Sequence, residues 1–406
     1  MATEIEERRI DTVDLRIGMF VCRLDRPWEG TPFPLQGLEI GTDGDLRALR
    51  ELCEFVYIDK RREVVDQHRR QILARTSLQD ARFRRATTYT DKASVEDELP
   101  RAREALQTAS EMVDRLYLEI ASGRELSIEY VEQAVRPLVA SVLRSADAFL
   151  YLEGMRKHDS YTYSHAISCS ALAAAFGRHM GLHEDTIISL AAGGMLMDVG
   201  KTRVPETLLD YPGSLSSPQV EVVREHVGHG LDILATAGIN DPDVVAIVRT
   251  HHERHDGSGY PNHLVGSAIP VAGRMLGMID TYDAMASVRP YRPPISRHRA
   301  LQHIYAARDR LFQTELVEQF QVCLGVYPTG SLVELTTGEV AVVMMQNQAR
   351  RLRPRVLVLS TPAKQPLMDF RVLDLLNQAN DASATEITRS LAVGEYGIDA
   401  AEHFLQ

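Results

Sequence analysis

The alternation of apolar and polar residues changes character along the chain. Between residues 10 and 59, short apolar runs such as "LRIGMFVCRLD", "PFPLQGLEI" and "FVYID" are broken by Gly, Pro and Asp. Runs of this length, rich in β-branched and aromatic residues, are typical of strands joined by turns. We therefore predict a small β-rich module on the N-terminal side.

The spacing becomes helical from about residue 100 to residue 150. Apolar residues such as Val113, Leu116 and Ile120 recur at intervals of three and four, which is the period of an amphipathic helix. The stretch "SGRELS" (122–127) interrupts this pattern, and a second amphipathic helix follows. The helical pair belongs either to the core of the next domain or to a dimerisation and signal-transmission element.

Residues 150 to 325 also read as mainly helical, with Gly/Pro loops between segments. Ser217 followed by Pro218 marks one helix start. The pattern then changes again, because "GSLVELTTGEVAVVMM" (330–345) and "RPRVLVLS" (353–360) alternate like strands, with "TTGE" as a turn and a polar tail after them. The predicted fold class is mainly α, with the N-terminal β module and a small β appendage on the C-terminal side.

Length and composition limit the classes of protein that fit. A chain of 406 residues suggests two or three domains. The formal net charge of −11 argues against general attraction to a nucleic acid polymer or a membrane surface, although a local basic pocket for one anionic ligand is compatible with it. The start "MATEIEERRID" has no apolar secretory segment, and no run approaches the ~20 apolar residues of a membrane helix. We expect a soluble cytoplasmic protein without membrane insertion.

Two further features concern charge and cysteine. Residues 60–85 carry nine Lys/Arg and three Asp/Glu, which fits a solvated linker or exposed helix, or a contact with an acidic partner. The four cysteines lie far apart and form no CxxC pair, so a disulfide framework or a cysteine zinc site is not expected. They are Cys22, Cys53, Cys169 and Cys323.

The candidate chemistry lies in a histidine-rich segment. Ten of the fourteen histidines fall between His158 and His263, and histidine is the commonest metal ligand. His251 and His252 are adjacent, so both can reach one site only near the end of a helix. A subset of residues in or beside apolar helical stretches could surround divalent ions: His165, Asp198, His226, His251, His252 and Asp280.

The motifs "SHAISCS", "MDVGK", "EHVGHG", "HHERHDGSGYP" and "IDTYDAMASVRPYR" occur in that order between residues 150 and 325. This series resembles the HD-GYP family, a branch of the HD phosphohydrolases, and "DLRIGMFVCRLDRPW" resembles a small domain often fused to it. The resemblance implies an HD-type helical bundle. It also implies four parts: a β-rich N-terminal domain (1–62), a basic linker and helical connector (63–148), the phosphohydrolase domain (149–325), and a β appendage with a tail (326–406).

The implied activity is hydrolysis of the second messenger cyclic di-GMP to linear pGpG, and further to GMP, at a site with several metal ions. The six residues above would be the metal ligands, with Asp198 bridging two ions. An all-nitrogen-and-oxygen ligand set suits iron, manganese or zinc better than copper(I). Lys201 would donate to the phosphate or the leaving oxygen. The implied substrate-binding residues are Gly259, Tyr260, Pro261, Arg289 and Arg292.

Two positions depart from the family pattern. Methionine stands at position 197, where the family has the histidine of its HD motif, and Tyr161 stands where some relatives carry a glutamate for a third ion. A thioether is a poor ligand for these metals, so we expect Met197 to pack as a hydrophobe and one ion to lose a ligand. We therefore expect one or two ions, iron or manganese, and a weakened enzyme. The alternative is an inactive regulator that binds cyclic di-GMP or a partner such as a diguanylate cyclase, with a homodimer as a further possibility.

Overall fold

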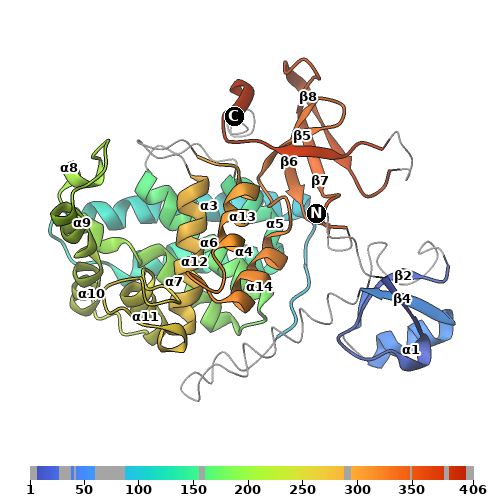
Figure 1. The fold of residues 1–406 in the computed structure, drawn as a ribbon, viewed down its shortest axis with the longest axis horizontal. Helices are drawn as coiled ribbons and strands as arrows, with labels where there is room; N and C mark the ends of the chain where they lie inside the picture. Colours follow the sequence, from blue (N-terminus) through green and yellow to red (C-terminus); the bar gives the residue numbers. More distant parts are fainter. Residues whose placement is uncertain are drawn as a thin grey trace.

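The structure is a computed structural model that describes residues 7–26, 38–40, 43–59, 87–154, 161–287, 294–347, 350–378 and 384–398. In chain order, a small antiparallel sheet is followed by a long run of helices and then by a second antiparallel sheet (Figure 1). The predicted class, mainly α with a small β unit on each side, is confirmed. The basic stretch of residues 60–85 lies outside the described residues.

The N-terminal module contains a four-stranded antiparallel sheet in the order β1–β4–β2–β3, drawn in blue in Figure 1. Its elements are β1 (Glu7–Asp11), η1 (Thr12–Asp14), β2 (Phe20–Leu24), β3 (Leu38–Glu39), α1 (Asp43–Leu52) and β4 (Phe55–Asp59). Val56 and Ile58 of β4 alternate with half-buried neighbours and pack with Leu49 of α1, as expected for a strand with one covered face. We did not predict α1, which is short and mostly polar.

The helical pair consists of α3 (Val95–Ala121) and α4 (Ile128–Arg144). The predicted break at residues 122–127 lies between them, and Leu116 and Ile120 are buried as the spacing indicated. The two helices pack on each other and on the helices that follow, and their apolar residues belong to the same core. Of the two interpretations of this pair, the structure supports a place in the core, while a role in dimerisation stays a prediction.

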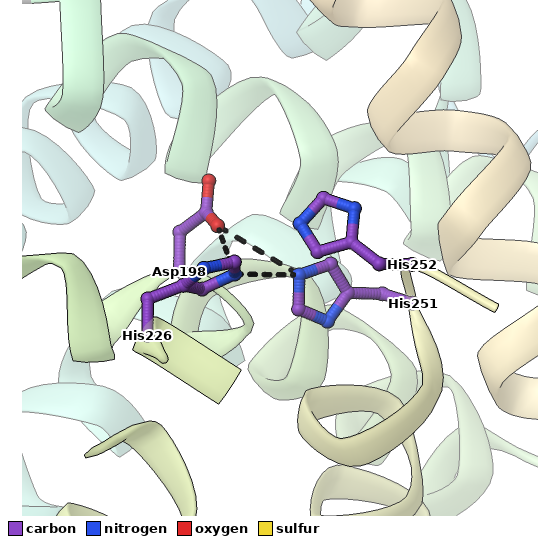
Figure 2. A group of neighbouring side chains, drawn as sticks. All are labelled: Asp198, His226, His251 and His252. Atoms are coloured by element: carbon purple, nitrogen blue, oxygen red, sulfur yellow. Dashed lines mark hydrogen bonds and ion pairs between the residues drawn. The ribbon is translucent and has the colours of Figure 1, made fainter. Parts of the chain in front are cut away.

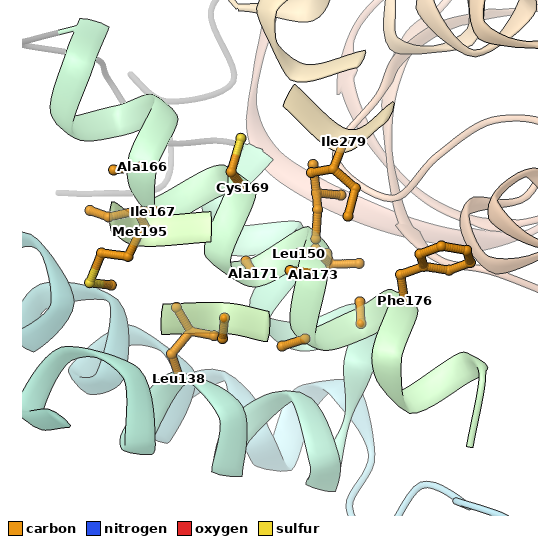
Figure 3. Close-up of a cluster of buried hydrophobic side chains, with 14 of the residues drawn as sticks. Leu138, Leu150, Ala166, Ile167, Cys169, Ala171, Ala173, Phe176, Met195 and Ile279 are labelled. Atoms are coloured by element: carbon orange, nitrogen blue, oxygen red, sulfur yellow. The ribbon is translucent and has the colours of Figure 1, made fainter. Parts of the chain in front are cut away.

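Helix α6 (Tyr161–His179) runs through the centre of the helical part, between α5 (Ala146–Gly154) and α7 (Glu184–Leu196). Figure 3 shows its small residues, among them Ala171 and Ala173, beside Leu138 of α4 and Leu150 of α5. From Ser164 to Gly177 every residue of α6 is buried. A helix that is covered on all sides needs no polar face, which explains its weak apolar periodicity.

The remaining helices complete the bundle and carry most of the candidate chemistry. They are η3 (Val199–Arg203), α8 (Glu206–Leu209), α9 (Ser217–Arg224), α10 (His226–Thr236), α11 (Pro242–Thr250), η4 (Gly266–Ala268), α12 (Val271–Ala286), α13 (Arg297–Ala306) and α14 (Thr314–Leu324). Helix α9 begins where the Ser-Pro pair predicted, and the preceding Ser216 is its N-cap residue. Within the described ranges, no helix is long and apolar enough to cross a lipid bilayer.

The C-terminal sheet has five antiparallel strands in the order β8–β7–β6–β5–β9. The elements are β5 (Leu332–Leu335), β6 (Val340–Met345), β7 (Arg355–Ser360), β8 (Pro366–Asp374), β9 (Ile387–Ser390) and η5 (Glu395–Gly397). The predicted strands and the turn between β5 and β6 are confirmed. The prediction of a polar tail after residue 360 is wrong, because β8 and β9 follow as the two edge strands of the sheet. Edge strands with an exposed face carry many polar residues, so their sequence resembles that of a tail.

The sheet is joined tightly to the helical core. Gly154 at the end of α5 meets Gly330 before β5. A Cβ atom on Gly154 would lie 2.9 Å from Cα of Gly330, and a Cβ atom on Gly330 would lie 3.0 Å from Cα of Gly154. Nearby, Asp147 of α5 accepts hydrogen bonds from the Thr329 hydroxyl (2.5 Å) and the Gln346 amide (3.1 Å). Apolar residues of β5, β6 and β7 belong to the same buried cluster as the helices. The sheet therefore shares its core with the helical domain.

Candidate metal centre

The six predicted metal ligands converge from five separate parts of the helical domain. His165 lies on α6, Asp198 between α7 and η3, His226 at the start of α10, His251 and His252 directly after α11, and Asp280 on α12. Because α11 ends at Thr250 and His251 is its C-cap residue, the adjacent imidazoles can both reach the cluster, as the sequence indicated. Two groups of ligand atoms result, and Asp198 belongs to both.

The first group joins Asp198 to three imidazoles (Figure 2). Its Oδ1 atom lies 3.5 Å from Nε2 of His226 and 3.7 Å from Nε2 of His251, and these two nitrogens lie 3.4 Å apart. One ligand atom from each of the four residues lies within 4.8 Å of the others. Three imidazoles and a carboxylate so close together are a donor set typical of a transition-metal site.

The second group uses the other oxygen of Asp198. Its Oδ2 atom lies 3.7 Å from Nε2 of His165, which in turn lies 3.1 Å from Oδ1 of Asp280. The two carboxylate oxygens of Asp198 therefore face two different sets of ligand atoms. This is the arrangement that a carboxylate bridging two cations requires.

Backbone carbonyls fix the orientation of two imidazoles. Nδ1 of His226 lies 2.7 Å from the Val223 carbonyl oxygen, and Nδ1 of His251 lies 3.1 Å from that of Val248. A carbonyl oxygen can only accept, so Nδ1 carries the proton in each ring. The lone pair of each Nε2 atom is then left facing Asp198, and this is the tautomer that a metal-binding histidine needs.

The protonation states also fit cation binding. Burial lowers the pKa of His226 to about 4 and that of His252 well below its ordinary value, so both rings are neutral at pH 7. Burial alone would raise the pKa of Asp198, but the ammonium of Lys201 holds it well below its usual range. Among the described residues, no group hydrogen-bonds to the buried Oδ1 atom of Asp198. A buried anionic oxygen in this state is costly without a cation, so the residues present fit a metal.

Met197 packs as a hydrophobe. Its side chain is fully buried in the main apolar cluster, directly before Asp198. Met197 thus adds no nitrogen or oxygen donor to the second group, where His165, Asp198 and Asp280 supply three ligands. The first group keeps four, so the two sets of ligands are unequal.

Lys201 lies within the cluster rather than at its surface. It follows Asp198 by three residues on η3, and its Nζ atom donates to Oδ2 of Asp198 at 2.6 Å. About a quarter of its side chain is exposed. Its ammonium therefore pairs with the same Asp198 oxygen that faces the second group of ligand atoms.

The loop "DGSGYP" lies beside the imidazoles. The ring of Tyr260 stacks on that of His252, with centroids 4.6 Å apart and planes inclined by 21°. A Cβ at Gly259 would lie 2.4 Å from the His252 carbonyl oxygen, so only glycine fits there. The buried Glu253 carboxylate accepts hydrogen bonds from the backbone amides of Asn262 and Leu264, which follow Pro261. These contacts hold Tyr260 against the candidate metal site.

One residue of the site was missed by the sequence reasoning. Asp283 places Oδ2 2.7 Å from Nδ1 of His165, on the side of the ring opposite Asp280. It lies three residues after Asp280 on α12, so the spacing of two acids in "DTYDAM" was the available signal. Two other predicted residues, Arg289 and Arg292, lie outside the described residues, as does the side chain of Tyr161.

Comparisons with known protein families match the chain to two domain families. Residues 143–316 match the HD domain, and residues 7–131 match a domain of unknown function, DUF3391. The HD match lies close to the domain that we predict at 149–325. The other match covers the predicted N-terminal domain and most of the connector.

Individual proteins were also found to be similar. The cyclic di-GMP phosphodiesterase PA4108 of Pseudomonas aeruginosa is 30% identical over 370 residues, which cover 91% of this chain and 89% of that protein. The 3′3′-cGAMP-specific phosphodiesterase 2 of Vibrio cholerae is 34% identical over 154 residues, covering 38% of this chain and 29% of that protein. Among solved structures, an HDGYP protein from Bdellovibrio bacteriovorus covers 78% of this chain and 98% of its own at 13% identity, with a TM-score of 0.47.

Proposed function

Because this chain belongs to the HD-GYP branch of the HD domain family, we propose that it is a metal-dependent phosphodiesterase that hydrolyses cyclic di-GMP. The observation that carries the proposal is the carboxylate of Asp198, whose two oxygens face separate sets of ligand atoms. The names of its relatives support the choice of substrate. The first product is linear pGpG, which gives GMP if it is bound and cleaved again.

The roles of the side chains follow from the two groups. Asp198, His226, His251 and His252 would hold one ion, and His165 and Asp280 would share Asp198 with a second. When bound, such ions supply Lewis acidity at the phosphoryl oxygens and a nucleophilic water near neutral pH. Lys201 would then leave Asp198 and donate to the phosphate or to the leaving oxygen, and Tyr260 would contact the substrate beside His252. Gly259 and Pro261 shape this side of the pocket, while Arg289 and Arg292 stay predicted phosphate or guanine contacts.

Met197 supports the finer proposal of a weakened enzyme. Loss even of a residue that only supports a metal ligand costs about 10- to 100-fold in affinity or activity, and Met197 replaces a ligand itself. The cost falls on the group of His165, Asp198 and Asp280, which keeps three donors. We therefore propose one tightly held ion and a second that is weak or absent, with iron or manganese as the metal.

Turnover with defined metals tests the proposal. Purified protein is loaded anaerobically with Fe(II) or, separately, Mn(II) and incubated with cyclic di-GMP, while metal content is measured on the same samples. We expect metal-dependent formation of pGpG, abolished by His251→Ala. The same assay with 3′3′-cGAMP checks the related substrate. Absence of cleavage of either dinucleotide with both metals would overturn the enzymatic proposal.

A second candidate function is favoured by the same methionine. A chain that binds cyclic di-GMP without cleaving it would act as a receptor, and the loss of one ligand at position 197 is the feature that supports this. Binding of cyclic di-GMP without product in either metal would identify it. As protein partners we propose a diguanylate cyclase or a second copy of this chain, to be tested by co-purification and by measurement of the mass in solution.

A further inference from the structure

Arg224 brings a positive charge to the metal centre that no predicted role accounts for. It is the last residue of α9, two positions before His226. The carbon of its guanidinium lies 4.7 Å from the centroid of the Tyr260 ring. Since that ring also stacks on His252, Arg224 is joined to the candidate metal site through one aromatic side chain.

The hydrogen bonds of Arg224 leave part of its guanidinium available. Nη1 donates to Oε1 of Glu221 at 2.7 Å, in a pair whose side chains are 40% and 66% exposed. Exposed pairs of this kind contribute little to stability and are readily exchanged. The Nε atom, by contrast, is buried, and no residue in the described part of the chain accepts a hydrogen bond from it.

The guanidinium edge that carries Nε suits a phosphate once Arg224 leaves Glu221 and this edge becomes accessible. Nε–H and a neighbouring Nη–H form a planar fork that matches two oxygens of a phosphate group. Contact with the Tyr260 ring orients that fork, because guanidinium groups pack on aromatic faces. A cyclic dinucleotide has two phosphodiesters on one ring, so while one is at the metal ions the other is held close to them.

We propose that Arg224 is a substrate-binding residue that holds the second, non-reacting phosphodiester of a cyclic dinucleotide, exchanging its pair with Glu221 for that phosphate. This inference rests on the proposed function and gives it a determinant of substrate class. It separates a cyclic dinucleotide, with two phosphodiesters, from a mononucleotide with one phosphate. Tyr260 positions Arg224, and substitution of Arg224 leaves the metal ligands in place.

The test is a binding measurement on full-length protein loaded with Mn(II). The probes are a phosphorothioate analogue of cyclic di-GMP that resists cleavage, and GMP, which carries the same base and one phosphate. We expect Arg224→Met to weaken binding of the analogue at least tenfold and to change GMP affinity less than twofold. Arg224→Lys keeps the charge without the fork and is expected to recover only part of the loss.

Glu221→Gln is the matched control, since it removes the charge of the partner and leaves Arg224 in place. We expect it to bind the analogue as tightly as the wild type or up to threefold more tightly. Metal content and the melting temperature (Tm) of all variants should equal those of the wild type, which a merely structural role of Arg224 would not allow. Unchanged binding of the analogue by Arg224→Met, or an equal loss for GMP, would overturn this inference alone. Failure of the wild type to bind the analogue would overturn the proposed function together with it.

Discussion

The Nδ1 atom of His165 lies 2.7 Å from Oδ2 of Asp283, while Nε2 of the same ring lies 3.1 Å from Oδ1 of Asp280. The imidazole is thus held between two carboxylates of α12, one on each ring nitrogen. Ser287 donates a further hydrogen bond to Oδ2 of Asp283 at 3.0 Å. Asp283 therefore fixes the tautomer and direction of His165 from behind, as carboxylates do for many metal-binding histidines.

Replacing this supporting carboxylate should weaken one metal group selectively. We expect Asp283→Asn to lower the affinity for the ion at His165, Asp198 and Asp280 by about 10- to 100-fold, because the ring loses its charged partner. Affinity at the three-imidazole group should not change. Competition with a chelator, followed by metal analysis, measures both. Ser287→Ala removes only the hydroxyl and is the milder comparison, and equal loss of both ions would contradict the assignment.

Restoring a nitrogen ligand at position 197 should strengthen the same group. We expect Met197→His to raise the metal content towards two ions per chain and the turnover number by about tenfold or more, since a missing ligand of this kind costs at least that much. Met197→Leu keeps an apolar side chain of similar volume and should leave metal content and turnover as they are. A variant that binds two ions without faster turnover would show that the methionine is not what limits the rate.

Lys201 offers a prediction in which two measurements move in opposite directions. Its ammonium now pairs with Oδ2 of Asp198 at 2.6 Å, so Lys201→Met should raise the apparent metal affinity by removing a competitor for that oxygen. It should also lower kcat about 10²- to 10⁴-fold, the usual contribution of a positioned group that transfers a proton. Arg203, exposed on the same short helix, provides the control Arg203→Met. A fall in metal affinity would contradict this role.

The close packing at Gly259 predicts a local loss of stability. A methyl group there would meet the Arg254 amide nitrogen and the His252 carbonyl oxygen, both at 2.4 Å. We expect Gly259→Ala to lower the free energy of unfolding by about 1–3 kcal/mol, the usual cost of overpacking. Gly228 of α10 has no atom within 4 Å of its Cβ position, so Gly228→Ala should be neutral or stabilising by about 0.5–1 kcal/mol. Denaturant unfolding of both variants gives the comparison.

Asp147, at the junction with the C-terminal sheet, predicts a pH dependence of stability. Burial raises the pKa of this carboxyl from 3.8 to about 6. The folded chain therefore holds a proton that the unfolded chain has lost between these values, and stability falls as the pH rises from about 4 to about 6. The free energy of unfolding falls by about 3 kcal/mol over this range, and the fall is complete above pH 6.

Asp147→Asn removes that titration, so its stability relative to wild type should improve from pH 4 to pH 7. The oxygen of the new side-chain amide still accepts from the Thr329 hydroxyl, but its NH2 group cannot accept from the backbone amide of Gln346. This lost hydrogen bond adds a cost that does not vary with pH. Chemical denaturation at several pH values measures the difference, and the exposed Asp232 provides the control Asp232→Asn. A difference between wild type and Asp147→Asn that stays constant across this range would contradict the prediction.

The sequence predicted what depends on spacing and missed what depends on packing partners. The convergence of His251 and His252 followed from the end of a helix, and the burial of Met197 followed from its chemistry. Asp283 was not found, because the spacing of two acids in "DTYDAM" does not by itself show that the second one supports a histidine. Strands β8 and β9 were read as a tail, because their polar residues face outward at the edges of a sheet and leave little alternation.

The C-terminal sheet is part of the smallest fragment of this chain that can fold. Gly154 packs against Gly330, and apolar residues of β5, β6 and β7 lie in the same buried cluster as those of the helices. Truncation at residue 316, where the HD match ends, would remove most of α14 as well as the sheet, and would uncover hydrophobic side chains of α5 and α6 that these elements now cover. We expect such a fragment to aggregate on expression, whereas one that continues to Ile398 keeps its interior closed.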